Sequence, residues 1–214
     1  MDKELSFSDR SLWWVNSFIG RTIINLITIH MFYFLFINLY VRPLYAFINC
    51  VISYEIMDLM TGISHYWSDR SYTQTDKKTI FNQHHLIPHS YNHTNWMDRR
   101  YIFGYFILPT YLIFLYFLDI RIAFIILYAQ IVETSHTYAH KRTSGELIPK
   151  FWLICQNYGI FVSPEHHKKH HIELSCNYCI FSGHMDIILN PFLHIAHMYF
   201  PYTDGQTGKI ISSN

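Results

Sequence analysis

The sequence predicts an all-α integral membrane protein: a single domain, residues 1–214, with about four transmembrane helices and a histidine-rich site for two metal ions at the cytosolic face. Charged residues make up only 14% of the chain, whereas soluble globular proteins carry about 25%. Several apolar segments are long enough to span a bilayer. The 15 histidines equal Asp and Glu together in number. The net charge of +1 indicates no nucleic-acid partner.

Four segments are the predicted membrane crossings. Residues 22–41 contain no Asp, Glu, Lys or Arg, and about 20 residues of helix cross the hydrocarbon core of a bilayer. Residues 44–64 and 102–118 follow, and residues 121–138 become polar toward their end. Residues 1–20 form a polar amino-terminal segment in which we expect no cleavable signal peptide. The alternative is a soluble all-helical protein with very hydrophobic helices.

Charge predicts the orientation of these crossings. Four crossings would leave both histidine-rich stretches on the side of the amino terminus, where most Lys and Arg residues lie. The opposite turns carry only Arg42 and Arg121. Because positive residues accumulate on the cytoplasmic side, the histidines should face the cytosol. Residues 139–214 are therefore expected to be cytosolic or interfacial, with apolar stretches at 151–162 and 187–200 in the interface.

Histidines recur in four short motifs whose spacing groups them on a helix. Residues three and four positions apart are neighbours on a helix surface. Ser163 and Pro164 predict a helix start before the densest motif, because Ser is a favoured cap and Pro a favoured first residue. The motifs are "HYWSD" (His65, Asp69), "QHHLIPH" (His84, His85, His89), "HTYAH" (His136, His140) and "HHKKHH" (His166, His167, His170, His171). The pattern indicates metal ligands; a basic patch that binds lipid phosphates is the alternative for the last motif.

The surplus of imidazoles indicates two metal ions. Imidazole binds zinc, copper, iron and nickel, and a zinc hydrolase needs about three protein ligands and an open position. The motifs offer at least eight histidines in three regions, which favours two ions and oxidative chemistry. Acidic residues near a ligating histidine often orient it. Asp58 is the first candidate for that role, and Glu55 and Glu133 are further ones.

Other histidines and the cysteines are expected to be structural. Cys176 and Cys179 form a single Cys-x-x-Cys, which we interpret as buried thiols rather than a redox or metal pair. The isolated histidines, predicted to be packed, hydrogen-bonded or interfacial, are His30, His184, His194 and His197.

Several motifs, in the same order, resemble those of the Kua family of membrane lipid desaturases, which includes the CarF-like plasmanylethanolamine desaturases and a plant enzyme acting on phosphatidylglycerol. The resemblance runs from about Tyr54 to Ile210. It rests on "DLMTGISHYWSD", "QHHLIP", "HTYAH", "PEHHKKHH", "NYCIFSG" and "GQTGK". Two places depart from the family pattern. Tyr66 stands where the family has tryptophan, and "TNWMDRR", with His93 one position early, replaces an acidic run.

The resemblance implies an oxidoreductase: a di-iron desaturase that uses O2 and acts on a membrane phospholipid. With an alkyl-ether (plasmanyl) chain the product is a vinyl ether, a plasmalogen. An acyl-lipid desaturase or a hydroxylase of the same family is the first alternative, and a zinc-dependent membrane lipid hydrolase is a more distant one. The sequence shows no flavin or haem motif, so cytochrome b5 or a ferredoxin is the expected electron donor. The membrane would be the endoplasmic reticulum in a eukaryote or the inner membrane in a bacterium.

The motifs assign roles to named residues. The predicted metal ligands are His65, His84, His85, His136, His140, His166, His167, His170 and His171. The predicted catalytic residues are His65, Asp69, His140, His167 and His171.

Overall fold

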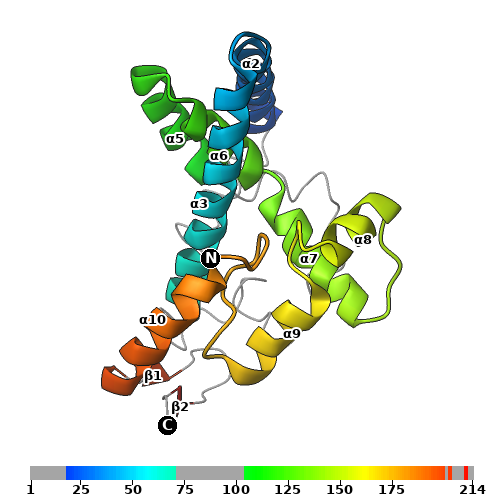
Figure 1. The fold of residues 1–214 in the computed structure, drawn as a ribbon, viewed down its shortest axis with the longest axis vertical. Coiled ribbons are helices and arrows are strands. Elements are labelled where there is room, and N and C mark those ends of the chain that lie inside the picture. The colour runs from blue at the N-terminus through cyan, green and yellow to red at the C-terminus, as the bar shows by residue number, and fades with distance from the viewer. Residues whose placement is uncertain (1–17, 71–103, 201, 204–209, 212–214) are drawn as a thin grey trace, which may run out of the picture. The chain divides into compact units, whose positions relative to one another are not determined.

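The structure, a computed structural model, describes residues 18–70, 104–200, 202–203 and 210–211. Apart from two short antiparallel strands, β1 (Tyr202–Thr203) and β2 (Ile210–Ile211), the elements in these ranges are α-helices (Figure 1). The described residues fall into two compact units, one within residues 18–57 and 104–134 and the other within residues 58–70 and 135–211. The predicted helical class is therefore confirmed for the described residues.

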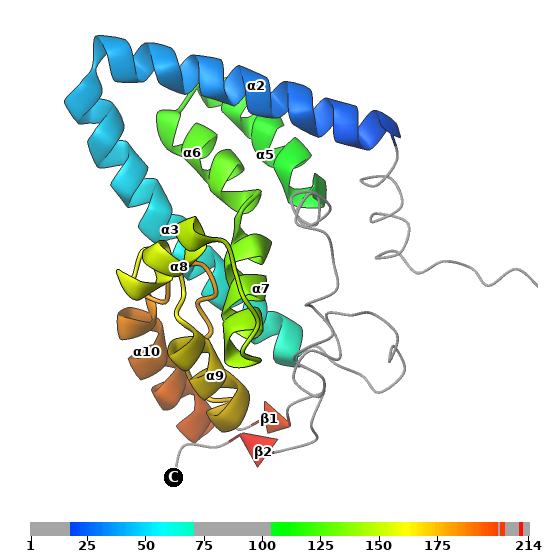
Figure 2. The same ribbon diagram turned by 90° about the vertical axis from the view of Figure 1, so that its right-hand side faces the viewer.

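The first unit contains the helices α2 (Phe18–Val41), the first half of α3 (Pro43–Arg70), α5 (Gly104–Phe117) and α6 (Ile120–Ala129). Helix α6 packs against both α2 and α5 (Figure 2). By length and composition, α2 and the first 25 residues of α3 are two candidate membrane spans. At about 1.5 Å per residue, each is long enough to cross the hydrocarbon core of about 30 Å.

Polar side chains inside the first unit are paired between helices. His30 Nδ1 lies 2.7 Å from the Tyr111 hydroxyl, which joins α2 to α5. Thr28 Oγ1 donates to Gln130 Oε1 at 3.0 Å. Unpaired polar groups in an apolar environment are costly, so these pairs explain how an apolar unit accommodates them. His30 is thus hydrogen-bonded, as expected.

Helix α5 covers residues 104–117 of the predicted crossing 102–118, whose first two residues lie outside the described ranges. The segment expected to form one helix over 121–138 is divided between α6 and α7 (Val132–Thr143). At the division the Gln130 N–H reaches the Leu127 carbonyl at 3.2 Å and the Ile131 N–H reaches the Tyr128 carbonyl at 2.9 Å. These bonds span three residues instead of four, so the α-helical pattern is interrupted there. Pairing of the Gln130 side chain with Thr28 accompanies the break.

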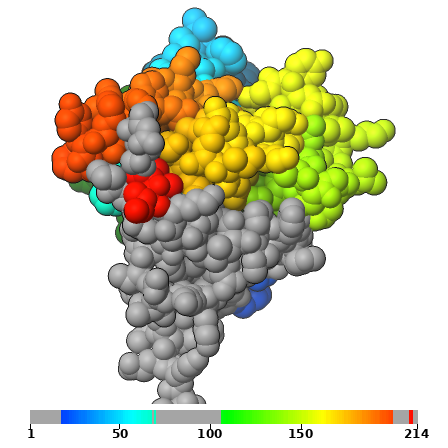
Figure 3. Space-filling model, turned by 90° about the horizontal axis from the view of Figure 1, so that it is seen from below, coloured from blue at the N-terminus to red at the C-terminus, as the bar shows by residue number. Residues whose placement is uncertain are grey.

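The second unit consists of the end of α3, most of α7, α8 (Lys150–Asn157), α9 (Pro164–Glu173) and α10 (Asp186–Tyr199). In Figure 3, α9 in gold lies between α10 in orange and the yellow-green α7–α8 region. Ser163 caps α9, accepting the His166 N–H at 3.1 Å, and Pro164 is its first residue. The predicted start of this helix is confirmed.

A close contact joins α3 to α10 within the second unit. Tyr66, Cys179, Leu189 and Leu193 belong to one buried cluster. A Cβ atom on Gly62 would lie 2.5 Å from Cys179 Sγ and 2.7 Å from Leu189 Cδ2, closer than atoms pack. A larger residue would therefore require these side chains to shift, so glycine suits this close approach of the helix to its neighbours.

Candidate metal centre

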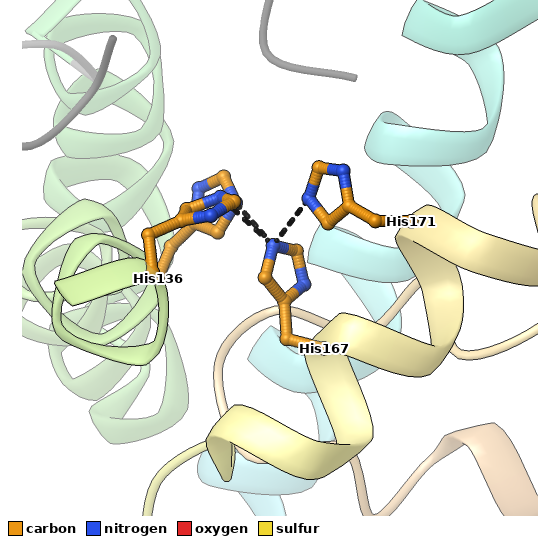
Figure 4. A group of neighbouring side chains, drawn as sticks. His136, His167 and His171 are labelled. Atoms are coloured by element: carbon orange, nitrogen blue, oxygen red, sulfur yellow. Dashed lines mark hydrogen bonds between the residues drawn. The ribbon is translucent and has the colours of Figure 1, made fainter. Parts of the chain in front are cut away.

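A first group of four histidines converges from two helices. His136 and His140 lie one turn apart on α7, and His167 and His171 lie one turn apart on α9. His167 Nε2 lies 2.9 Å from His136 Nε2, 3.0 Å from His140 Nε2 and 2.9 Å from His171 Nε2. Figure 4 shows the rings of His136 and His171 on either side of the His167 ring. His136 Nε2 and His140 Nε2 are 3.0 Å apart. Three of these rings are buried, and that of His171 is half-buried.

Hydrogen bonds alone do not account for this convergence. An imidazole carries at most one hydrogen on Nε2, so three nitrogens in mutual contact, those of His136, His140 and His167, cannot all be paired by hydrogen bonds. A shared cation would satisfy their lone pairs together. At a metal–nitrogen distance of about 2.0–2.1 Å, two ligands at a right angle lie about 2.9 Å apart. The observed separations thus fit neighbouring ligands of one ion.

The environment of His167 keeps its ring neutral. Burial, followed by the charges that His136, His140 and His171 would carry, lowers the pKa of His167 well below its usual value of 6.5. A metal ligand must be the neutral imidazole. A neutral His167 ring can therefore offer one nitrogen lone pair to a metal ion at neutral pH.

A second group lies beside the first and includes a carboxylate. Asp69 Oδ2 is 3.5 Å from His170 Nε2 and 3.8 Å from His65 Nε2. His65 and Asp69 are one turn apart near the end of α3, His170 belongs to α9, and all three are buried. Two nitrogens and one oxygen are suitable ligands for zinc or iron.

Backbone carbonyls set the orientation of both rings in the second group. His170 Nδ1 is 2.8 Å from the Cys176 carbonyl oxygen, and His65 Nδ1 is 3.1 Å from the Tyr178 carbonyl oxygen. A carbonyl only accepts, so each Nδ1 carries the hydrogen and each Nε2 is left with its lone pair toward Asp69. This is the usual arrangement behind a ligating histidine.

The two groups are neighbours. The ring centroid of His65 lies 5.9 Å from that of His136 and 6.2 Å from that of His167. His167 and His170, three positions apart on α9, have ring centroids 6.0 Å apart. One helix thus supplies ligands to both groups, which fits two adjacent ions.

His166 and Asp58 have other partners among the described residues, and their predicted roles at the metal site stay predictions. Among the described residues His166 is outside both groups; its Nε2 pairs instead with the buried Asp186 carboxylate at 2.8 Å. Asp58 accepts backbone N–H groups from Ser182 at 2.7 Å and Met185 at 2.9 Å. Its carboxylate is thus used in holding the segment between α9 and α10.

The remaining predicted residues are placed as follows. Glu133 is buried on α7 and Glu55 half-buried on α3, and their role as orienting groups stays a prediction. Cys176 and Cys179 are free thiols, and burial raises the pKa of Cys176 to about 12, with the Glu173 carboxylate adding to the effect. The predicted residues that lie outside the described part of the chain are His84, His85, His89 and His93.

Several contributors to the site carry no signal in the sequence. The carbonyls of Cys176 and Tyr178 act through the backbone, which every residue possesses. The only sequence signal for Asp186 is that it is a single acidic residue before an apolar stretch. The assignment of His167 and His171 to one group and His170 to the other was open, because a spacing of three or four residues allows each pairing.

Comparison with known proteins identifies the family. The model of the lipid desaturase domain matches residues 54–199, a span that contains every residue of both groups. No curated protein and no solved structure matches the chain. Because the match covers more than half of the sequence, this chain, with its two groups of converging metal-ligand side chains, belongs to the lipid desaturase family.

Proposed function

We propose that the protein is a di-iron, O2-dependent desaturase of a membrane phospholipid. The observation that carries the proposal is the adjacency of two buried ligand groups, one of four histidines and one of two histidines with a carboxylate. Iron accepts imidazole and carboxylate ligands together. The match to the lipid desaturase domain supports a lipid chain as the substrate.

The overall reaction balances with an external reductant. Two adjacent CH2 groups lose two hydrogens and become CH=CH, while O2, two electrons and two protons yield two molecules of water with those hydrogens. Bound iron would supply the redox chemistry with O2. A one-electron carrier of the cytochrome b5 or ferredoxin class would supply the electrons.

The protein's own residues would hold and shield the ions. The first group would bind one iron through His136, His140, His167 and His171, and the second would bind the other through His65, Asp69 and His170. Six of these seven side chains are buried, so water has little access to the ligand atoms. Exclusion of water is what an oxidative site requires, because it limits side reactions.

We further propose that the lipid is an alkyl-ether phospholipid and the product a vinyl ether. The motifs shared with CarF-like plasmanylethanolamine desaturases support this choice. An acyl-lipid desaturase of the same family would use the same ligands on a different chain.

A location at the membrane surface is supported by the side chains of α10. Asp186, Leu189, Leu193 and His197 form its buried face. The exposed surface of α10 is largely apolar. An exposed apolar helix face can be buried in the headgroup–acyl boundary of a membrane. The exposed apolar residues of α10 are Ile187, Ile188, Phe192, Ile195, Met198 and Tyr199.

We propose four membrane crossings with the metal ligands at the cytosolic face, in the endoplasmic reticulum or a bacterial inner membrane according to the source. Helices α2 and α3 have the length for two crossings. Helix α5 and the α6–α7 pair would form the other two, and the charge distribution along the sequence supports the orientation.

Lipid mass spectrometry tests the function. The chain is expressed in cells that lack plasmalogens but contain alkyl-ether phospholipids, with and without O2. We expect alkyl-ether lipids to lose two hydrogens and become acid-labile only in the presence of O2. His171→Ala should abolish the product, whereas His194→Ala, at an exposed position of α10, should retain it.

Other outcomes distinguish the alternatives. A new double bond in acyl chains would replace the ether substrate by an acyl lipid, and a product that gains one oxygen would indicate a hydroxylase. Lipid cleavage that persists without O2 and with zinc in place of iron would indicate a hydrolase. Full desaturation by the double variant His167→Ala/His171→Ala would refute the metal site.

A further inference from the structure

We propose that Asp186 and Asn190, one turn apart on α10, are positioning residues for the second ligand group. Each holds the N–H of one peptide unit in the segment 176–179, and the carbonyl of that same unit orients one histidine. The inference rests on the proposed function only in that the second group binds a metal ion.

The first of these connections runs from Asn190 to His170. The peptide unit between Cys176 and Asn177 donates its N–H to Asn190 Oδ1 at 2.8 Å. Its carbonyl accepts from His170 Nδ1, also at 2.8 Å. In a trans peptide the N–H and C=O point in opposite directions within one rigid plane. Fixing the N–H therefore fixes the direction in which the carbonyl meets the ring.

The second connection has the same form and runs from Asp186 to His65. The peptide unit between Tyr178 and Cys179 donates its N–H to the Asp186 carboxylate, at 3.1 Å from Oδ2. Its carbonyl accepts from His65 Nδ1 at 3.1 Å. Two side chains one turn apart on α10 thus each reach one histidine of the second group, and each does so through its own peptide unit.

Asn177 sits between these two units and is itself held. Its φ of 60° lies in the left-handed region, which Asn tolerates better than most residues. Asn190 Nδ2 donates to Asn177 Oδ1 at 2.9 Å, and Asn177 Nδ2 donates to the His166 carbonyl at 3.2 Å. The amide of Asn190 therefore contacts both the backbone and the side chain of Asn177, which suits a positioning role.

The two connections differ in charge. Asp186 is buried and also pairs with His166 at 2.8 Å, whereas Asn190 is neutral. Hydrogen bonds in a chain polarise one another, so a carboxylate behind the peptide unit should make the Tyr178 carbonyl the stronger acceptor. His65 should then be the more electron-rich ligand. Groups that orient a ligand from behind typically affect metal affinity by about 10–100-fold.

The experiment measures metal binding to the purified full-length protein in detergent. Fe²⁺ under anaerobic conditions and Co²⁺, whose absorption bands report its coordination, are titrated in competition with a chelator. For Asn190→Leu we expect the affinity of one of the two ions to fall by about 10–100-fold and the affinity of the other to stay unchanged. The Co²⁺ bands of the weakened site should shift as well.

Matched variants separate positioning from general destabilisation. Asn190→Asp keeps an oxygen for the Asn177 N–H and should retain most of the affinity that Asn190→Leu loses. Asp186→Asn keeps an acceptor but removes the charge, so it should change the Co²⁺ bands while leaving two ions bound. Asn157→Leu, at an exposed position of α8, is the control and should behave as wild type.

Defined results would overturn the inference. These are wild-type affinity for both ions in Asn190→Leu, equal weakening of both ions, or equal losses in Asn190→Leu and Asn190→Asp. A wild-type protein that binds two ions without desaturating lipid would refute the proposed function and leave this metal-binding test valid. The two failures are therefore distinguishable.

Discussion

At the scale of single residues, His167 occupies the central position of the first ligand group. Its Nε2 lies within 3.0 Å of the corresponding nitrogen of three other histidines. Loss of the His167 ring should therefore disturb the whole first group.

His167→Ala tests this centrality. We expect iron content to fall from about two ions per chain to about one, and desaturation to fall by more than about 100-fold, since a lost ligand should cost more than a lost orienting group. Metal analysis and lipid mass spectrometry measure the two effects. The control His194→Ala should keep both ions; two retained ions in His167→Ala would show that this ring is not a ligand.

The lowered pKa of His167 predicts how the stability of the metal-free protein depends on pH. The folded ring stays neutral, whereas the unfolded ring takes up a proton below its ordinary pKa of 6.5. Below about pH 6.5 the unfolded state binds more protons, so the free energy of unfolding should fall by up to about 1.4 kcal/mol per pH unit. Above that pH the ring should contribute no dependence.

Thermal unfolding in detergent with a chelator, between pH 7.5 and 5.5, measures this dependence. The unfolding temperature of the wild type should fall more steeply in acid than that of His167→Gln, which lacks the titrating ring. Parallel slopes for the two proteins would contradict the prediction, because other groups would then account for the whole effect.

At the scale of elements, the spacing on α9 divides its histidines between partners. His167 and His171 form one row that faces α7, His170 meets the end of α3, and His166 pairs with Asp186. A single helix with an ordered start at Ser163 thus connects both ligand groups. Correct packing of the helices around α9 is therefore a condition for the second group.

The glycine at the contact of α3 with α10 is testable in the same terms. Gly62→Ala would place a Cβ 2.5 Å from Cys179 Sγ and 2.7 Å from Leu189 Cδ2. Overpacking typically costs about 1–3 kcal/mol, so the unfolding temperature should fall. The shift of Cys179 should also weaken the ion at the second group, because its N–H belongs to the peptide unit that orients His65.

The double variant Gly62→Ala/Cys179→Ala is the control for that clash. Removal of the Sγ atom should restore part of the lost stability. A Gly62→Ala protein as stable as wild type, with both ions bound, would mean that α3 and α10 do not pack as closely as described.

At the scale of the whole molecule, the number of membrane crossings is the main prediction. Helices α2 and α3 are long and apolar enough to span, while α5 has 14 residues and α6 has 10. If α5 and the α6–α7 pair also cross, residues 42 and 121 lie on one side of the membrane and residue 146 lies on the other.

Single cysteines introduced by Arg42→Cys, Arg121→Cys and Glu146→Cys report these positions. A membrane-impermeant thiol reagent should label the first two from the non-cytosolic side and the third from the cytosolic side, above the background of the parent protein. Labelling of Arg121→Cys from the cytosolic side would contradict four crossings, because the turn between α5 and α6 would then not reach the non-cytosolic side.

The helical class, the start of α9 and the clustering of histidines follow from the sequence, because periodicity and capping are properties of a single local segment. His65 and Asp69, or His136 and His140, are neighbours on any helix that contains them. Only the tertiary structure decided which rows meet and that His166 pairs with Asp186 outside both groups. It also showed that Asp58 holds backbone N–H groups and that α6 ends before α7 begins. Such contacts join residues distant in sequence, and many use backbone groups that are the same at every position.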